Sequence, residues 1–229
     1  MNFFDLHTHR VQLLPSVAIL SLCMKDGTPP PDACFLAVGI HPWRLSSDDF
    51  QSQVQWLDTM AKDDRVVAIG EAGLDRRCGT PLELQAQAFI HAIHVSEAKR
   101  LPLIIHCVKA TSEIISMKKA LSPSQTWIIH GFRGKPELAK TLLQHGFYLS
   151  FGERFNEESL RQTPPDRLFL ETDESRVGIE TICNKVATVR NVPTEDLQNQ
   201  VLNNVLTAFN NAQSIQTICR SLLSQVKAY

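Results

Sequence analysis

Residues 3–9 read Phe3-Phe4-Asp5-Leu6-His7-Thr8-His9, an apolar run that ends in two histidines one residue apart. Side chains alternate between the two faces of a β-strand, so His7 and His9 would point to the same side. Other apolar runs end in the same kinds of residue, namely at or near Glu71, His106, His130 and Asp173. Imidazole and carboxylate groups together suit divalent cations such as Zn²⁺, Mn²⁺ or Mg²⁺. The pattern therefore predicts a metal site built from strand ends.

The composition is that of an ordinary globular protein. The chain has 229 residues, of which 43% are hydrophobic and 21% charged, and its formal net charge is −1. This length fits one α/β domain over residues 1–229, and the net charge provides no overall positive field to attract nucleic acid. The six cysteines are scattered without a CxxC pair, and no apolar run reaches membrane-spanning length. We expect reduced thiols, a cytoplasmic location, no membrane association and no obligate protein partner.

Apolar runs of strand length recur along the chain. Most of them are continuous rather than alternating, which is typical of strands buried on both faces in a parallel sheet. We expect eight strands, over Phe3–His7, Val17–Leu22, Cys34–Gly39, Val66–Gly70, Leu103–His106, Thr126–His130, Phe147–Ser150 and Arg167–Glu171.

Helical patterns separate the later strands. Apolar residues recur at three- and four-residue spacing over Asp48–Lys62, Pro81–Arg100, Thr111–Ala120, Pro136–His145 and Glu157–Gln162, and helices are also expected over Arg176–Arg190, Thr194–Asn210 and Ser214–Lys227. By contrast, Arg10–Ser16 is short, and Met24–Ala33 contains a glycine and three consecutive prolines that oppose a helix. The order of elements predicts an α/β fold, a TIM-like (β/α)8 barrel with reduced helices after strands 1 and 2 and extra C-terminal helices. In such barrels the catalytic groups lie at the C-terminal ends of the strands, so the six candidate ligands would share one rim.

The chain resembles the TatD family of metal-dependent deoxyribonucleases, within the amidohydrolase superfamily. The resemblance covers nearly the whole sequence and rests on an ordered set of motifs. These are Asp5-Leu6-His7-Thr8-His9, Gly39-Ile40-His41-Pro42, Gly70-Glu71-Ala72-Gly73-Leu74-Asp75, Ile105-His106, His130-Gly131-Phe132-Arg133-Gly134, Ser150-Phe151-Gly152, Glu171-Thr172-Asp173 and Asn204-Val205-Leu206-Thr207-Ala208-Phe209.

The resemblance implies a site for two divalent metal ions, which would be Mg²⁺, Mn²⁺ or Zn²⁺. His7 and His9 would hold one ion together with Asp173, and His106 and His130 would hold the other. Glu71 would bridge the two ions. Asp173 would also orient or deprotonate the attacking water, which makes Asp173 and Glu71 the expected catalytic residues. Asp5 and Asp75 would support the ligands from outside.

Substrate contacts are expected from Arg133, Lys109, Arg76 and His41, which stand at or beside strand ends. The family usually carries an arginine at the position of Val108, so recognition of a DNA strand is expected to differ here. These few cations fit DNA ends, short oligonucleotides or a small phosphodiester. A metal-dependent amidohydrolase or deaminase acting on a small molecule remains an alternative, as does a binding protein without activity.

Overall fold

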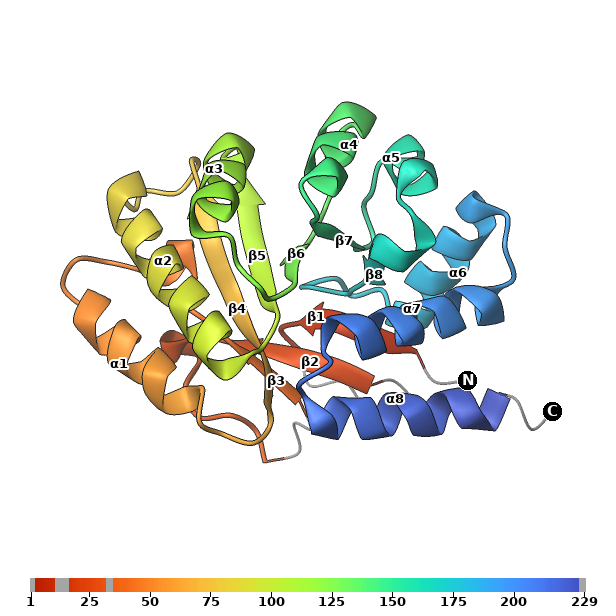
Figure 1. Ribbon diagram of the computed structural model, residues 1–229, viewed down its shortest axis with the longest axis horizontal. Helices are drawn as coiled ribbons and strands as arrows, with labels where there is room; N and C mark the ends of the chain where they lie inside the picture. Colours follow the sequence, from red (N-terminus) through yellow and green to blue (C-terminus); the bar gives the residue numbers. More distant parts are fainter. Residues whose placement is uncertain (1–2, 11–16, 32–34, 227–229) are drawn as a thin grey trace.

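The computed structural model describes residues 3–10, 17–31 and 35–226. The described residues form one sheet of eight parallel strands whose order in space follows the sequence (Figure 1). The strands are β1 (Phe4–Thr8), β2 (Val17–Leu22), β3 (Phe35–Val38), β4 (Val66–Asp75), β5 (Leu103–Val108), β6 (Trp127–Ile129), β7 (Tyr148–Phe151) and β8 (Leu168–Leu170). Most strand residues are buried, as the continuous apolar runs predict.

The sheet curves round until its first strand meets the segment that follows its last. Thr8 at the end of β1 forms a parallel bridge with Asp173. The backbone N–H of Asp173 donates to the His7 carbonyl oxygen at 2.8 Å, and that of His9 donates to the Asp173 carbonyl oxygen at 3.2 Å. The TIM-like barrel predicted from the sequence is therefore confirmed as a nearly closed barrel.

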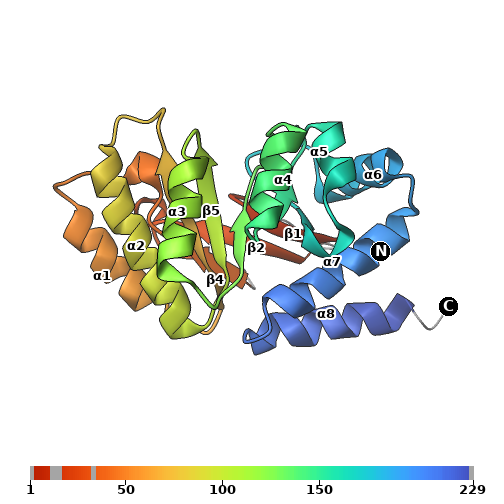
Figure 2. The same cartoon turned by 45° about the horizontal axis from the view of Figure 1, so that its top comes forward.

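Helices cover the outside of the barrel (Figure 1). They are α1 (Phe50–Met60), α2 (Leu82–Lys99), α3 (Thr111–Leu121), α4 (Pro136–Gln144), α5 (Glu157–Gln162), α6 (Ile179–Arg190), α7 (Thr194–Ala208) and α8 (Gln213–Val226). Figure 2 shows α7 and α8 lying side by side, and α7 also contacts β8 and β1. The C-terminal helices thus cover part of the wall near β1, with apolar residues of α7 such as Leu197, Val201 and Val205 buried.

The reduced crossover after the second strand is also present in the part of the chain that the structure describes. Between β2 and residue 31, that part holds only the short 3-10 helix η1 (Met24–Asp26). The expected short connection after the first strand lies within residues 11–16, outside the described residues. A second 3-10 helix, η2 (Pro42–Arg44), follows β3 before α1 begins. No helix among the described residues is both long and apolar enough to cross a lipid bilayer.

Two predicted boundaries were wrong by three residues or more. Strand β4 does not end at Gly70 but continues to Asp75, so Glu71 lies inside the strand. The strand can continue because Gly73, at φ +153°, lies so close to β5 that a Cβ there would collide with the backbone carbonyl of His106. Helix α6 begins at Ile179 rather than at residue 176, because the preceding residues form a turn in which Ser175 Oγ accepts a hydrogen bond from the Val177 N–H.

Candidate metal centre

The candidate ligands come from five parts of the barrel. His7 lies in β1 and His9 directly after it, Glu71 in β4, His106 in β5, His130 directly after β6, and Asp173 three residues beyond β8. Parallel strands bring their carboxyl ends to one rim of a barrel. The structure accordingly places all six side chains around one point, although the sequence separates the first from the last by 166 positions.

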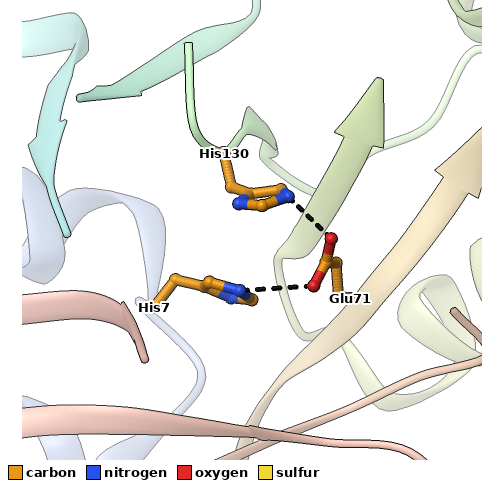
Figure 3. A group of neighbouring side chains, drawn as sticks. All are labelled: His7, Glu71 and His130. Carbon is orange, nitrogen blue, oxygen red and sulfur yellow. Dashed lines mark ion pairs between the residues drawn. The ribbon is translucent and has the colours of Figure 1, made fainter. Parts of the chain in front are cut away.

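Glu71 is the centre of this group. Its Oε1 lies 2.5 Å from His106 Nδ1, 2.7 Å from His130 Nε2 and 3.0 Å from His41 Nε2. Its Oε2 lies 3.3 Å from His7 Nε2 and 3.4 Å from His9 Nε2. Figure 3 shows His7, in β1, and His130, in the segment directly after β6, approaching the two oxygens of the carboxylate. The two oxygens of Glu71 therefore face two different sets of histidines.

Asp173 stands at the solvent side of the group. Its Oδ1 lies 3.8 Å from His7 Nε2 and 3.7 Å from His9 Nε2, and its side chain is 26% exposed. Its backbone adopts a left-handed conformation with φ 54°, held by the bridge to Thr8. Asp is among the residues that adopt this conformation with the least strain. The barrel closure thus fixes a partly hydrated carboxylate beside the first histidine pair.

The buried polar atoms at this point fit a bound cation. Neither ring nitrogen of the fully buried His7 has a hydrogen-bond partner. A buried nitrogen that lacks a partner is costly unless an ion or a water completes its contacts. The ligand atoms of His7, His9 and Asp173 lie within 4.8 Å of one another, as do those of His7, Glu71 and His130. Imidazole and carboxylate donors at this spacing suit Zn²⁺, Mn²⁺ or Mg²⁺.

The charges in the group support each other. Burial acts to raise the pKa of the Glu71 carboxyl, but the charge of His130 and the hydrogen bonds of the neighbouring imidazoles hold it well below its usual range. Burial acts to lower the pKa of His130, yet Glu71 and Glu171 raise it well above its ordinary value. Glu71 is therefore an anion at neutral pH, which is the state in which a carboxylate can bind a metal ion.

Two buried carboxylates orient the histidine rings from behind. Asp75 Oδ2 lies 3.1 Å from His106 Nε2, which leaves Nδ1 of that ring facing Glu71. Glu171 Oε1 lies 3.3 Å from His130 Nδ1 and accepts a hydrogen bond from the Gly131 N–H at 2.6 Å. Carboxylates in this position fix the tautomer and direction of metal-binding imidazoles. Sequence reasoning gave Asp75 such a role but none to Glu171, although its place two residues before Asp173 was a usable signal.

Asp5 supports the barrel closure rather than a histidine ring. This fully buried carboxylate accepts hydrogen bonds from the Thr172 N–H at 2.9 Å and from Thr172 Oγ1 at 2.7 Å. Burial raises the pKa of Asp5 to about 7, although the hydrogen bonds of Thr172 act to lower it. Asp5 thereby ties β1 to the residue next to Asp173.

His41 enters the group from the loop after β3. Its Nδ1 accepts a hydrogen bond from the Trp43 N–H at 3.0 Å, so in the neutral ring the proton is on Nε2, which faces Glu71. Burial lowers the pKa of His41 below its ordinary value, against the raising effect of Glu71, and this favours the neutral ring. His41 is therefore a hydrogen-bond donor in the wall of the site.

A pocket of about 390 Å³ opens beside the group. Besides ligand candidates such as His9 and His106, it is lined by His41, Trp43 and Arg44. Its volume lies in the range of small-molecule sites. Arg44 was missed by sequence reasoning because it stands in η2, beyond any strand end, and only the fold brings it to the pocket.

The other predicted substrate contacts lie outside this pocket. Arg133 lines an adjoining pocket of about 250 Å³, which shares Asp173 with the first. Arg76 is exposed and pairs with Glu113 of α3. Lys109 is exposed and lines neither pocket.

Comparison with known proteins gives one consistent result. A family model described as TatD related DNase matches residues 16–210. The chain is 32% identical over 151 residues to an uncharacterized metal-dependent hydrolase of Bacillus subtilis, YabD, an alignment that covers 62% of this chain and 59% of that protein. It is 33% identical over 171 residues to a protein named 3'-5' ssDNA/RNA exonuclease TatD of Cronobacter turicensis, covering 70% of this chain and 64% of that protein. The chain thus spans about three fifths of the length of these two relatives.

Solved structures agree on the fold. The crystal structure of YJJV, a TatD homologue from Escherichia coli, superposes with a TM-score of 0.74 at 20% identity, covering 91% of this chain and 98% of that one. A TatD-family hydrolase from Entamoeba histolytica gives a TM-score of 0.72 at 16% identity, with 90% and 97% covered. At these identities the likeness concerns the barrel itself.

Proposed function

Because the chain belongs to the TatD related DNase family, we propose that this metal-dependent hydrolase cuts phosphodiester bonds at the ends of single-stranded DNA or in short oligonucleotides. The observation that carries the proposal is the arrangement around Glu71. One buried carboxylate directs one oxygen at His7 and His9 and the other at His106 and His130. That arrangement is the one that a bridging ligand between two cations requires.

The six residues would divide between two divalent ions as the family resemblance implies. His7, His9 and Asp173 would hold the first ion, His106 and His130 the second, and Glu71 would belong to both. When bound, such ions polarise a phosphate oxygen and lower the pKa of a water molecule, so that the water can attack phosphorus near neutral pH.

The protein's own residues would position the water and carry its proton. Asp173 is the carboxylate of the group that keeps contact with solvent, and its Oδ1 stands beside both histidines of the first pair. We assign to it the orientation and deprotonation of the attacking water. His41 would present its Nε2–H to Glu71 and to an incoming phosphate oxygen, because its neutral ring has its proton on that side.

The distribution of cations favours a small or single-stranded substrate. Among the described residues, Arg44 is the one arginine or lysine side chain that lines the main pocket, which is the pocket of about 390 Å³ beside Glu71. Arg133 and Arg154 line the adjoining pocket. Each phosphate contact adds to affinity and to its salt dependence, and a long duplex needs many of them. Three arginines are therefore better suited to bind a strand end or a short oligonucleotide than a long duplex.

The test is a defined substrate panel with controlled metal content. The chain is stripped with a chelator, reloaded with Mg²⁺, Mn²⁺ or Zn²⁺, and given end-labelled single-stranded DNA, closed circular duplex, and small amides and lactones. Glu157→Gln, on the exposed surface of α5, serves as the matched control for Glu71→Gln. The proposal requires stepwise shortening of the single strand by the wild type and the control. Turnover of an amide or lactone, with no phosphodiester hydrolysed under any metal, would contradict it.

A further inference from the structure

The indole of Trp43 is an unusually exposed apolar group beside a buried site. The Trp43 residue is 62% exposed, against 36–40% for Ile90, Leu121 and Val192, the other exposed large hydrophobic residues in the described part of the chain. It lies in η2 and lines the main pocket together with His41 and His106. Leaving so much apolar surface in water forgoes the free energy that burial would provide.

The indole is held in place by polar contacts. Its Nε1–H donates to Asp75 Oδ2 at 2.6 Å, and its backbone N–H donates to His41 Nδ1 at 3.0 Å. Asp75 is buried and contacts His106 through the same oxygen. Because the one polar atom of the ring is satisfied, the exposed remainder is a carbon surface with a fixed position relative to the histidines.

The ring contacts of Trp43 leave room for a stacked partner. His41 and His106 lie at centroid distances of 5.3 Å and 5.6 Å, with interplanar angles of 79° and 76°. Both rings therefore meet the indole edge to face, and neither is stacked parallel to it. A group bound at His106 and a flat ring stacked on Trp43 are close enough to belong to one small ligand.

We propose that Trp43 is a stacking platform for the nucleobase next to the phosphate that is cut. This inference rests on the proposed phosphodiesterase function and names a substrate contact for it. Base–aromatic stacking tolerates every base and alters binding by about 5- to 150-fold per base. The side chain of Arg44, the next residue, is 54% exposed. Within the described part of the chain its one ion-pair contact is with Asp26, at 3.9 Å, so it would be free to meet the phosphate of the stacked nucleotide.

The first experiment measures stacking without turnover. A phosphorothioate-linked tetranucleotide, and the same backbone with abasic residues, are titrated into the Mn²⁺-loaded protein while tryptophan fluorescence is recorded. Trp56→Phe is the control, because Trp56 is half-buried in α1 and lines neither pocket. The base-bearing ligand should quench the wild type and Trp56→Phe but leave Trp43→Leu nearly unchanged, and the abasic ligand should quench none of them. Equal quenching by both ligands, quenching that survives in Trp43→Leu, or no quenching of the wild type would overturn the proposal.

The second experiment separates stacking from catalysis. The ratio of kcat/KM for the base-bearing and abasic phosphodiesters is measured in wild type, Trp43→Phe and Trp43→Leu. Both variants lose the hydrogen bond to Asp75, but phenylalanine keeps an aromatic face. The ratio should be about 5 to 150 in the wild type, largely retained in Trp43→Phe, and close to one in Trp43→Leu. An unchanged ratio in Trp43→Leu refutes stacking while the phosphodiesterase stands. Failure of the wild type to cut either substrate refutes the phosphodiesterase, and the quenching result then decides the stacking alone.

Discussion

Asp173→Asn separates proton transfer from the binding of ligands. The amide keeps an oxygen near His7 and His9, where Asp173 Oδ1 now lies at 3.8 Å and 3.7 Å. It loses the negative charge and the ability to accept the water's proton. Loss of a positioned general base lowers turnover by about 10²–10⁴-fold, equivalent to about 2.7–5.5 kcal/mol of activation free energy.

The backbone at this position makes asparagine the correct replacement. At φ 54°, asparagine adopts the left-handed conformation as readily as aspartate, whereas alanine would add about 1–2 kcal/mol of strain. The bridge to Thr8 uses backbone atoms, so it survives the change. The fold of Asp173→Asn should therefore match the wild type, and its metal content should fall only in part.

The assay measures kcat on short single-stranded DNA at saturating metal, with thermal unfolding in chelator as the check on folding. Glu174→Gln is the matched control, because it neutralises the neighbouring exposed carboxylate that lines the same pocket. That control should keep most of the turnover. Near-normal turnover of Asp173→Asn would show that the proposed water activation is assigned to the wrong residue.

Three further changes test the site and the fold around it. Arg133→Ala should raise KM without changing metal content, because Arg133 lines the adjoining pocket and is not itself a candidate ligand; an unchanged KM would show that Arg133 does not contact the substrate. Gly73→Ala should lower the free energy of unfolding by about 3 kcal/mol through collision with the His106 backbone, whereas Gly79→Ala, which meets no neighbouring atom within 4 Å, should be nearly neutral in denaturant unfolding. Lys118→Met should stabilise the fold by about 1 kcal/mol at pH 7, allowing for partial hydration of the amine, because burial lowers the pKa of Lys118 to about 8 from its ordinary 10.5. Between about pH 8 and pH 10.5 the unfolded wild type holds more protons than the folded wild type, so its stability rises with pH. The higher melting temperature of Lys118→Met should therefore approach that of the wild type towards pH 10.5. A difference in melting temperature that does not change with pH would refute this.

The strands and the central group could be predicted because the sequence marks both locally. Apolar runs such as Val17–Leu22 specify buried strands by themselves, and that strand has the predicted bounds. His7, His106 and His130 stand at or near the ends of such runs, and the rule that parallel strands share one carboxyl rim places them together. Neither step requires knowledge of which distant residues touch.

The rest depends on tertiary contacts that no local pattern records. The continuation of β4 past Gly70 follows from the close approach of Gly73 to the His106 backbone. Arg76 stands on the predicted rim, but Glu113 of α3 pairs with it there. Arg44, by contrast with His41, was not predicted, because it lies in η2 beyond the strand end and only the fold brings it to the pocket.

The proposal to test first is that Glu71 binds two cations at once. Its direct test is the number of Mn²⁺ ions bound per chain, measured by equilibrium dialysis and elemental analysis for wild type, Glu71→Gln and the surface control Glu157→Gln. We expect two ions for the wild type and the control, and a parallel loss of affinity at both sites in Glu71→Gln, because the neutral amide offers no negative charge to either ion. A single ion in the saturated wild type, or a Glu71→Gln protein in which one site keeps full affinity, would contradict it.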